Sequence, residues 1–117
     1  MITPQNLSLF VKPNTPFANG RFHIELIIPQ TLPYFEGHFP ENPILPGVAF
    51  MDISLEALRV HAEVYSPLKT LKSAKYLGMV LPNDKIEIEC IQTSPSDWQV
   101  LWKKEEKKLC DLVLSFG

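Results

Sequence analysis

The sequence predicts an α+β domain in which an antiparallel sheet accompanies one long helix. Residues 21–28 alternate between apolar and polar side chains, as a half-buried strand does. One stretch, from Gly47 to about Tyr65, has the apolar spacing of a helix, and short alternating segments return after Thr70. At 117 residues, without an internal repeat or a linker, residues 1–117 are expected to form a single domain.

The first strand is predicted from a two-residue period. Its apolar side chains share one face, and its polar side chains lie mostly on the other. The apolar set is Phe22, Ile24, Leu26 and Ile28, and the polar set is Arg21, His23 and Glu25. Such alternation predicts a sheet with one face turned towards the core.

A proline-rich connection follows at residues 29–46. Five of the eleven prolines fall within these eighteen residues, and proline lacks the N–H group that helices and central strands need. Phe35, Ile44 and Leu45 accompany the prolines, which argues against disorder. We therefore expect a packed loop, and long loops inside small domains are usually functional.

The helix is predicted from apolar residues at steps of three and four. They are Val48, Met51, Leu55, Leu58 and Ala62. Pro67 prevents any continuation of the helix beyond this point.

The remainder of the chain predicts about four strands separated by turns. The expected strands cover about residues 70–80, 85–90, 98–103 and 108–116. Residues 81–84 and 94–97 contain the Pro, Asn, Asp and Ser residues of turns, and the charged run Lys103–Lys108 is expected to close a hairpin. Trp98, Val100 and Trp102 fall on one face of their strand and are expected in the core or in an interface.

Composition limits the classes of partner. The formal net charge of −2 gives no general attraction to nucleic acid or to an anionic membrane surface. Cys90 and Cys110 are far apart and form no CxxC pair, so we expect neither a zinc site nor a disulfide framework. The first ten residues lack the features of a signal peptide, and no apolar run reaches the roughly 20 residues of a membrane span. We expect a cytoplasmic protein without a membrane partner.

One motif carries most of the functional information. Residues 35–48 read FEGHFPENPILPGV, and Asp52 follows His38 by fourteen residues, inside the expected helix. This stretch resembles the G-H-F-P-x-x-P-x-x-P-G signature of the 3-hydroxyacyl-ACP dehydratases of bacterial fatty acid synthesis, in which an acidic residue lies one turn into the central helix. Residues 74–84 are similar, more loosely, to the K-F-x-x-P-V-x-P-G-D segment of the same family.

The resemblance implies a hot-dog fold, which is a curved antiparallel sheet wrapped around one long central helix. It implies the dehydration of a 3-hydroxyacyl thioester on acyl carrier protein to the trans-2-enoyl thioester. His38 and Asp52 would be the catalytic residues, contributed by different protomers of a dimer. Phe39, Pro46 and Val48 would line the substrate tunnel. No metal or cofactor is implied, because the substrate brings its own phosphopantetheine.

The chemistry of these residues suits that reaction. A neutral histidine such as His38 can take the proton from C2, and a carboxyl group such as Asp52 can protonate the departing hydroxyl. The negative charge that develops on the thioester oxygen needs a hydrogen-bond donor. Gly47 lies where the helix is expected to begin, so its backbone N–H is unpaired and close to the positive end of the helix dipole.

Two positions differ from the main fatty-acid-synthesis dehydratases. These usually have Glu where this chain has Asp52, and many have Gln where this chain has Glu56. Asp52, the short chain and the segment 43–49 look more like the aryl polyene-type dehydratases. Glu56 is a candidate second carboxylate, which either repels the charge of Asp52 if both are buried or faces solvent.

Two alternative functions remain at this stage. A hot-dog acyl thioesterase would use Asp52 or Glu56 to activate water and would leave His38 without a role. A non-catalytic subunit would bind acyl chains or support an active partner in a heterodimer. The sequence also leaves open a homodimer, a heterodimer with a hot-dog paralogue or a higher oligomer, and it leaves open acyl carrier protein or coenzyme A as the carrier. Four basic residues are candidates for receiving an acidic carrier protein: Arg59, Lys69, Lys72 and Lys75.

Overall fold

A computed structural model describes residues 12–35 and 44–117 of the chain. Within these ranges the chain forms one six-stranded antiparallel sheet and one long α-helix, α2. The strands are β1 (Lys12–Ala18), β2 (Arg21–Ile27), β3 (Leu68–Tyr76), β4 (Lys85–Gln92), β5 (Asp97–Lys104) and β6 (Lys107–Phe116). They lie in the order β1-β2-β4-β5-β6-β3. The predicted α+β class is confirmed.

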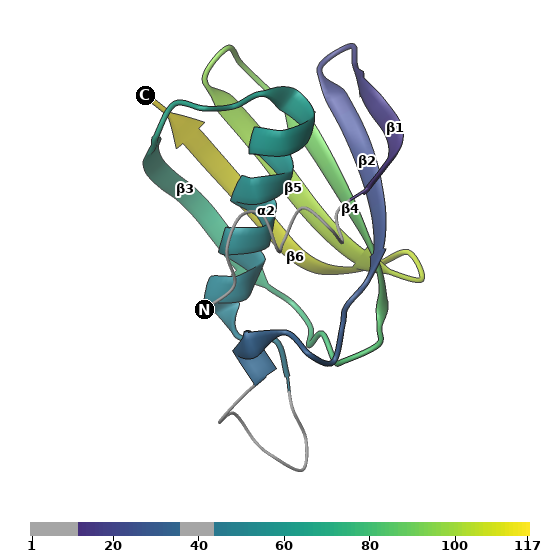
Figure 1. Cartoon of the computed structure of the whole chain (residues 1–117). Helices are drawn as coiled ribbons and strands as arrows, with labels where there is room; N and C mark the ends of the chain where they lie inside the picture. Colours follow the sequence, from purple (N-terminus) through teal and green to yellow (C-terminus); the bar gives the residue numbers. More distant parts are fainter. Residues whose placement is uncertain (1–11, 36–43) are drawn as a thin grey trace.

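Helix α2 (Gly47–Ala62) lies across the inner face of the curved sheet (Figure 1). The core forms between the two layers, from alternating residues of the strands and from the inner face of the helix. Fully buried members include Ile24, Ile53, Leu58, Ile88, Val100 and Trp102. The alternation in β2 and β4 therefore has the cause that the sequence predicted, since one face of each strand meets the helix.

The helix ends earlier than predicted. It stops at Ala62 rather than near Tyr65, because Glu63 adopts the left-handed conformation (φ 55°) and its N–H bonds to the carbonyl of Leu58. Pro67 lies four residues beyond this cap and does not set the helix end.

Strand β3 also differs from its predicted range of about 70–80. It begins at Leu68 and ends at Tyr76, after which the N–H groups of Leu77 and Gly78 both donate to the carbonyl of Leu109. The other three predicted strands are found within three residues of their expected ends. Strand β1 was not predicted, because Lys12–Ala18 contains two prolines and lacks alternation.

The hairpin between β5 and β6 closes where the charged run predicted it. Glu105 and Glu106 form its two-residue connection, and both have positive φ values, of 50° and 68°. Two positive values match the turn that suits the twist of neighbouring strands.

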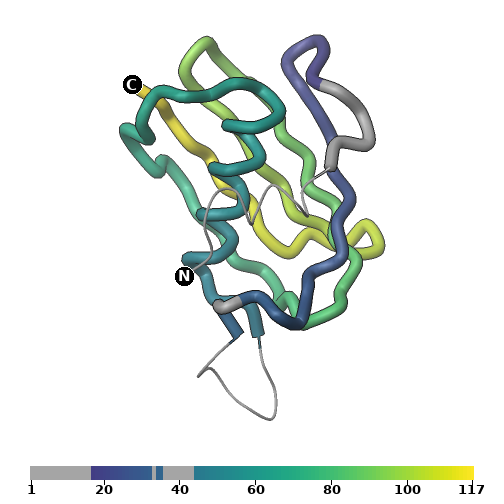
Figure 2. The backbone as a smooth tube through the Cα atoms, viewed as in Figure 1, coloured from purple at the N-terminus to yellow at the C-terminus, as the bar shows by residue number. Residues whose placement is uncertain are grey.

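The sheet has two edges, β1 and β3, which lie on opposite sides of the molecule (Figures 1 and 2). Among the strands of the described residues, β3 pairs with β6 alone, and its side chains are largely exposed. Two register shifts interrupt this pairing. Its outer edge therefore offers backbone donors and acceptors to another strand.

Candidate active site

Asp52 lies in the second turn of α2, at the border between the buried and the exposed side of the helix. Its side chain is half-buried. The hydroxyl of Tyr34 donates a hydrogen bond of 2.7 Å to Asp52 Oδ2, from a residue eighteen positions earlier in the chain. Asp52 is thus held by a specific partner and is not a freely solvated surface carboxylate.

Tyr34 belongs to a short 3-10 helix, η1 (Pro33–Phe35), which lies beside the first turns of α2 (Figure 1). Leu32, just before η1, and Phe35, its last residue, are both buried and anchor this segment to the core. Burial raises the pKa of the Tyr34 phenol above its usual value, and the hydrogen bond to Asp52 and the charge of that residue raise it further. The phenol therefore remains protonated and acts as a donor.

Gly47 is the first residue of α2, as predicted, and Pro46 occupies the N-cap position. The proline ring has no acceptor atom, so its side chain cannot cap the N–H groups of the first helical turn, whereas the Pro46 carbonyl accepts from the N–H of Ala49 at 3.0 Å. The N–H of Leu45 donates to the carbonyl of Val80 at 2.8 Å, which ties the helix start to the segment after β3. The segment between β3 and β4 therefore holds the residue pair that precedes Gly47, and the amide of Gly47 lies at the positive end of the helix dipole.

The exposed side of the first helical turns is apolar around these polar groups. Val48 is 60% exposed, and Met51 and Leu55 are half-buried along the same side as Asp52. The ring of Tyr76 lies next to Gly47, where a Cβ atom built on the glycine would be 3.5 Å from Tyr76 Cζ. The site thus combines a carboxyl group and the amides of a helix start with an apolar surface, which is the usual composition of a small-molecule site.

Glu56 takes neither of the two roles considered from the sequence. Its side chain is buried, at 6% exposure, and it forms an ion pair with Arg59 one turn further along the helix. Arg59 Nε lies 3.1 Å from Glu56 Oε1 and 3.3 Å from Oε2, and a further hydrogen bond joins Arg59 Nη2 to Oε1. The charge of Glu56 is therefore compensated within the helix by Arg59.

Three of the predicted site residues, Pro46, Gly47 and Val48, lie together at the start of α2, and Asp52 follows one turn later. His38 and Phe39, the predicted base and a predicted tunnel residue, fall outside the described residues. Tyr34 was not predicted. The only signal for it was a hydroxylated aromatic side chain four residues before His38, which sequence spacing could not connect with Asp52.

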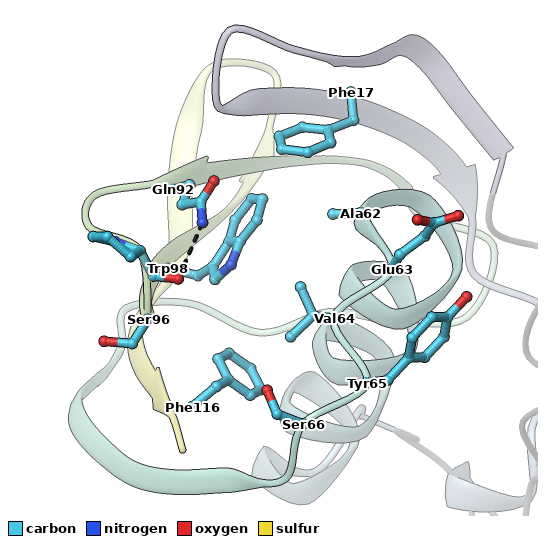
Figure 3. A pocket seen from close by; sticks show the side chains of 11 residues that line it. Phe17, Ala62, Glu63, Val64, Tyr65, Ser66, Gln92, Ser96, Trp98 and Phe116 are labelled. Carbon is cyan, nitrogen blue, oxygen red and sulfur yellow. Dashed lines mark hydrogen bonds between the residues drawn. The ribbon is translucent and has the colours of Figure 1, made fainter.

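A pocket of about 400 Å³ lies at the opposite end of α2 (Figure 3). Its apolar lining comes from the end of the helix and from strands β1, β5 and β6. The main lining residues are Phe17, Val64, Tyr65, Trp98 and Phe116. None of the predicted site residues lines it, so this pocket is separate from the candidate site.

Two of the four candidate basic residues are already engaged. Lys72 Nζ lies 2.6 Å from Asp97 Oδ2, and Arg59 is paired with Glu56. Lys69 and Lys75, both on β3, have exposed side chains. Any carrier contact through this group would therefore depend first on these two lysines.

The described ranges contain neither a metal-binding cluster nor a membrane-spanning helix. In residues 12–35 and 44–117, no three His, Cys, Asp or Glu side chains gather in a way that could hold a metal ion. In the same ranges no helix has the length and apolar character needed to cross a membrane. Cys90 and Cys110 are both buried and free.

Comparison with solved structures identifies the fold. The chain superposes on the dehydratase heterocomplex ApeI:P from Xenorhabdus doucetiae with a TM-score of 0.79 and 19% identity, covering 89% of this chain and 92% of that one. It also superposes on an uncharacterized protein from Erwinia carotovora with a TM-score of 0.74 and 17% identity, covering 92% and 90%. These likenesses confirm the predicted hot-dog fold.

Curated relatives are also similar over part of their sequences. The 3-hydroxyacyl-[acyl-carrier-protein] dehydratase FabZ of Bartonella bacilliformis is 41% identical over 64 residues, which cover 48% of this chain and 42% of that protein. The FabZ of Geotalea uraniireducens is 32% identical over 82 residues, covering 61% and 57%. The chain thus spans about half the length of these relatives.

A family model matches most of the chain. The model described as ApeI-like, ApeI dehydratase, covers residues 12–112, which include the motif and the whole of α2. The chain therefore belongs to the ApeI-like dehydratase family, which confirms the dehydratase family that the motif predicted.

Proposed function

We propose that the chain dehydrates a 3-hydroxyacyl thioester carried on acyl carrier protein and releases the trans-2-enoyl thioester. The observation that carries this proposal is the position of Asp52, which is held by Tyr34 one turn beyond the amides of Gly47 and Val48 at the helix start. Membership of a dehydratase family and the FabZ relatives support the same reaction.

The proposed reaction uses three groups of the chain. The neutral imidazole of His38 takes the proton from C2, and the thioester oxygen gains negative charge. The N–H of Gly47 donates a hydrogen bond to that oxygen, an interaction worth about 3–4 kcal/mol in comparable sites. The C3–O bond then breaks, and the carboxyl of Asp52 gives its proton to the departing hydroxyl, which leaves as water. The reaction requires no resident cofactor.

A second hot-dog protomer is part of the proposal. Within residues 12–35 and 44–117 no strand pairs with the outer edge of β3, and several apolar residues in β3 and just after it are exposed. These are Leu71, Tyr76, Leu77 and Met79. Pairing at this edge would cover exposed apolar surface close to Gly47, since Tyr76 lies next to that residue. The partner is a second copy of this chain or a paralogue, and His38 of one protomer serves Asp52 of the other.

The arrangement favours dehydration over thioester hydrolysis. A thioesterase would use Glu56 or Asp52 to activate water. Glu56 is ion-paired with Arg59, and hydrolysis through Asp52 would leave His38 without a role. Asp52 accepts a hydrogen bond from Tyr34 on one oxygen, which leaves the other available to transfer a proton.

One assay tests the proposal. The full chain is given a 3-hydroxyacyl thioester on acyl carrier protein and, separately, on coenzyme A, while enoyl product and free thiol are measured in parallel. We expect enoyl product, lost in both His38→Ala and Asp52→Asn, and more efficient turnover with the carrier protein. Free thiol that persists in His38→Ala would identify a thioesterase. If the chain binds acyl thioester without turnover, alone and together with hot-dog paralogues, the catalytic proposal is wrong.

A further inference from the structure

The hydrogen bond between Tyr34 and Asp52 distinguishes the two oxygens of a carboxyl group that would otherwise be equivalent. We infer that Tyr34 is a positioning residue: its phenol occupies Oδ2 of Asp52 and leaves Oδ1 to carry the proton delivered to the substrate hydroxyl. This inference rests on the proposed dehydration, in which Asp52 is the acid.

The geometry supports a fixed pairing. The separation of 2.7 Å between the Tyr34 hydroxyl and Asp52 Oδ2 is the usual length of a good O–H···O bond. Tyr34 is half-buried, and its neighbours Leu32 and Phe35 are buried, so the phenol is held by the core rather than by a mobile surface segment. A fixed donor on one oxygen also fixes the rotation of the carboxyl group about its last bond.

The same hydrogen bond suits both states of the acid. When Asp52 is protonated on Oδ1, its Oδ2 is the carbonyl oxygen and accepts from Tyr34. After the proton has gone to the leaving hydroxyl, Tyr34 donates to a full carboxylate, and such charge-assisted bonds are stronger. The phenol keeps its proton in both states, because burial and Asp52 together raise the pKa of Tyr34.

The pairing also gives the segment before the motif a role in catalysis. Tyr34 and Asp52 are eighteen residues apart in sequence and belong to η1 and α2 of the same chain. The proton donor is therefore oriented within one subunit, whatever partner supplies the base. A heterodimer with a paralogue would retain this arrangement in the present chain.

The first test measures the pair without requiring turnover. The three tyrosines are labelled with ¹³C at Cζ, and the titration of each phenol is followed by NMR in the wild type, in Asp52→Asn and in Glu63→Gln. We expect the pKa of Tyr34 to fall in Asp52→Asn, since the carboxylate that raises it has been removed, and to be unchanged in Glu63→Gln. If the pKa of Tyr34 is the same in Asp52→Asn as in the wild type, the inference is wrong.

The second test separates orientation of the acid from a general structural role. Tyr34→Phe keeps the ring and removes the donor, and Tyr65→Phe, which alters an exposed tyrosine beyond the far end of α2, is the matched control. With a 3-hydroxyacyl substrate we expect kcat to fall about ten- to hundredfold in Tyr34→Phe, with little change in KM, and to be unaffected in Tyr65→Phe.

A substrate that needs no acid completes the test. In a 3-chloroacyl thioester, His38 takes the same C2 proton, but chloride leaves with the electrons of the C3–Cl bond and requires no proton. We expect the loss in Tyr34→Phe to be at least fivefold smaller with this substrate. An equal loss with both substrates would show a structural role and overturn the inference.

Failure of the proposed function would look different from failure of this inference. A wild-type chain that forms no enoyl product from either substrate, alone or with a hot-dog paralogue, overturns both, even if the NMR titration detects the pair. A wild-type chain that forms enoyl product, with an equal loss for the two substrates in Tyr34→Phe, overturns only the role of Tyr34.

Discussion

The indole Nε1 of Trp102 donates a buried hydrogen bond of 2.9 Å to the hydroxyl of Ser54. Trp102 lies on β5, near the middle of the sheet, and Ser54 lies on α2 two residues after Asp52. The ring of Phe50 packs edge-on against Trp102, with 4.7 Å between ring centroids. Because a polar bond and an aromatic contact act on the same helical turns, the strand determines which side of the helix presents Asp52.

Trp102→Phe should therefore destabilise the protein by at least about 1–3 kcal/mol, because it leaves the buried Ser54 hydroxyl without its donor. Ser54→Ala should also destabilise it, because the indole N–H is then unpaired. Chemical denaturation of the two single variants and the double variant measures the coupling. We expect the double variant to lose less than the sum of the single losses, and strict additivity would contradict the role assigned to this bond.

Gly47→Ala should reduce turnover without reducing stability. A Cβ atom at residue 47 would meet Tyr76 at an ordinary contact distance of 3.5 Å, so the fold can accommodate it. Alanine is also the better helix former, by up to about 1 kcal/mol in a helix interior. The added methyl group would occupy space that the thioester needs, and we expect kcat/KM to fall at least about tenfold. Steady-state kinetics and thermal unfolding of the same preparation check both parts, and full activity would place the thioester elsewhere.

Mixing two inactive variants should restore activity if the active site is shared between protomers. In a dimer of His38→Ala and Asp52→Asn chains, one of the two sites keeps both intact residues. Random reassembly of equal amounts should therefore recover about one quarter of the wild-type rate. Each variant that has been unfolded and reassembled alone serves as the control. A mixture that remains inactive, although exchange of subunits is demonstrated by mass spectrometry, would place both residues of a site in one chain.

Asp97 should make the stability of the protein depend on pH in acid. The hydrogen bond from Lys72, followed by that from Ser115, lowers the pKa of Asp97 below its ordinary value of 3.8. A carboxyl group with a lowered folded-state pKa stabilises the protein above the unfolded-state value, and this contribution is lost as pH falls through the folded-state value. We expect Asp97→Asn to lower Tm at neutral pH, and the difference from wild type to shrink below about pH 4.

The control for that experiment is a variant that removes a carboxylate at a different, exposed position. Glu106→Gln removes an exposed carboxylate from the turn between β5 and β6, and we expect no comparable change in Tm. A difference between Asp97→Asn and wild type that stays constant into strong acid would show that the turn geometry, and not the charge of Asp97, is responsible.

Both cysteines should be unreactive in the folded protein. Cys90 and Cys110 are fully buried, and burial raises the pKa of each thiol, to about 12 for Cys110. Since the thiolate is the reactive form, a water-soluble disulfide reagent should modify neither thiol until the chain unfolds. Absorbance of the released thiol before and after denaturant measures this, and rapid modification of the native protein would indicate local opening of β4 or β6.

The parts of the fold that follow local rules were predicted from sequence. Strands β2 and β4 and helix α2 each bury one side. The apolar residues therefore recur with the period of the strand or the helix, which can be recognised in the sequence. The helix end was not predicted, because the left-handed conformation of Glu63 has no strong signal in a non-glycine residue. The edge strand β1 was missed because its pairing with β2, and not its own composition, makes it a strand.

In the candidate site, too, some residues were predicted from the sequence and others required the structure. Asp52 and Gly47 were predicted because a motif places them, and the structure puts Gly47 at the helix start as expected. Tyr34 and the ion pair of Glu56 with Arg59 required coordinates. The first joins residues eighteen positions apart, and the second depends on which side of α2 meets the sheet.

The N-cap residue of the central helix, Pro46, provides no side-chain cap for the N–H groups of the first turn. A ligand carbonyl that accepted hydrogen bonds from Gly47 and Val48 would act as the missing cap, so that binding and local folding of the first turn become one event. Amide hydrogen exchange at these two residues would then slow on saturation with a non-reactive thioester. The Tm of the protein would rise with ligand concentration, even though most of its core lies far from the ligand.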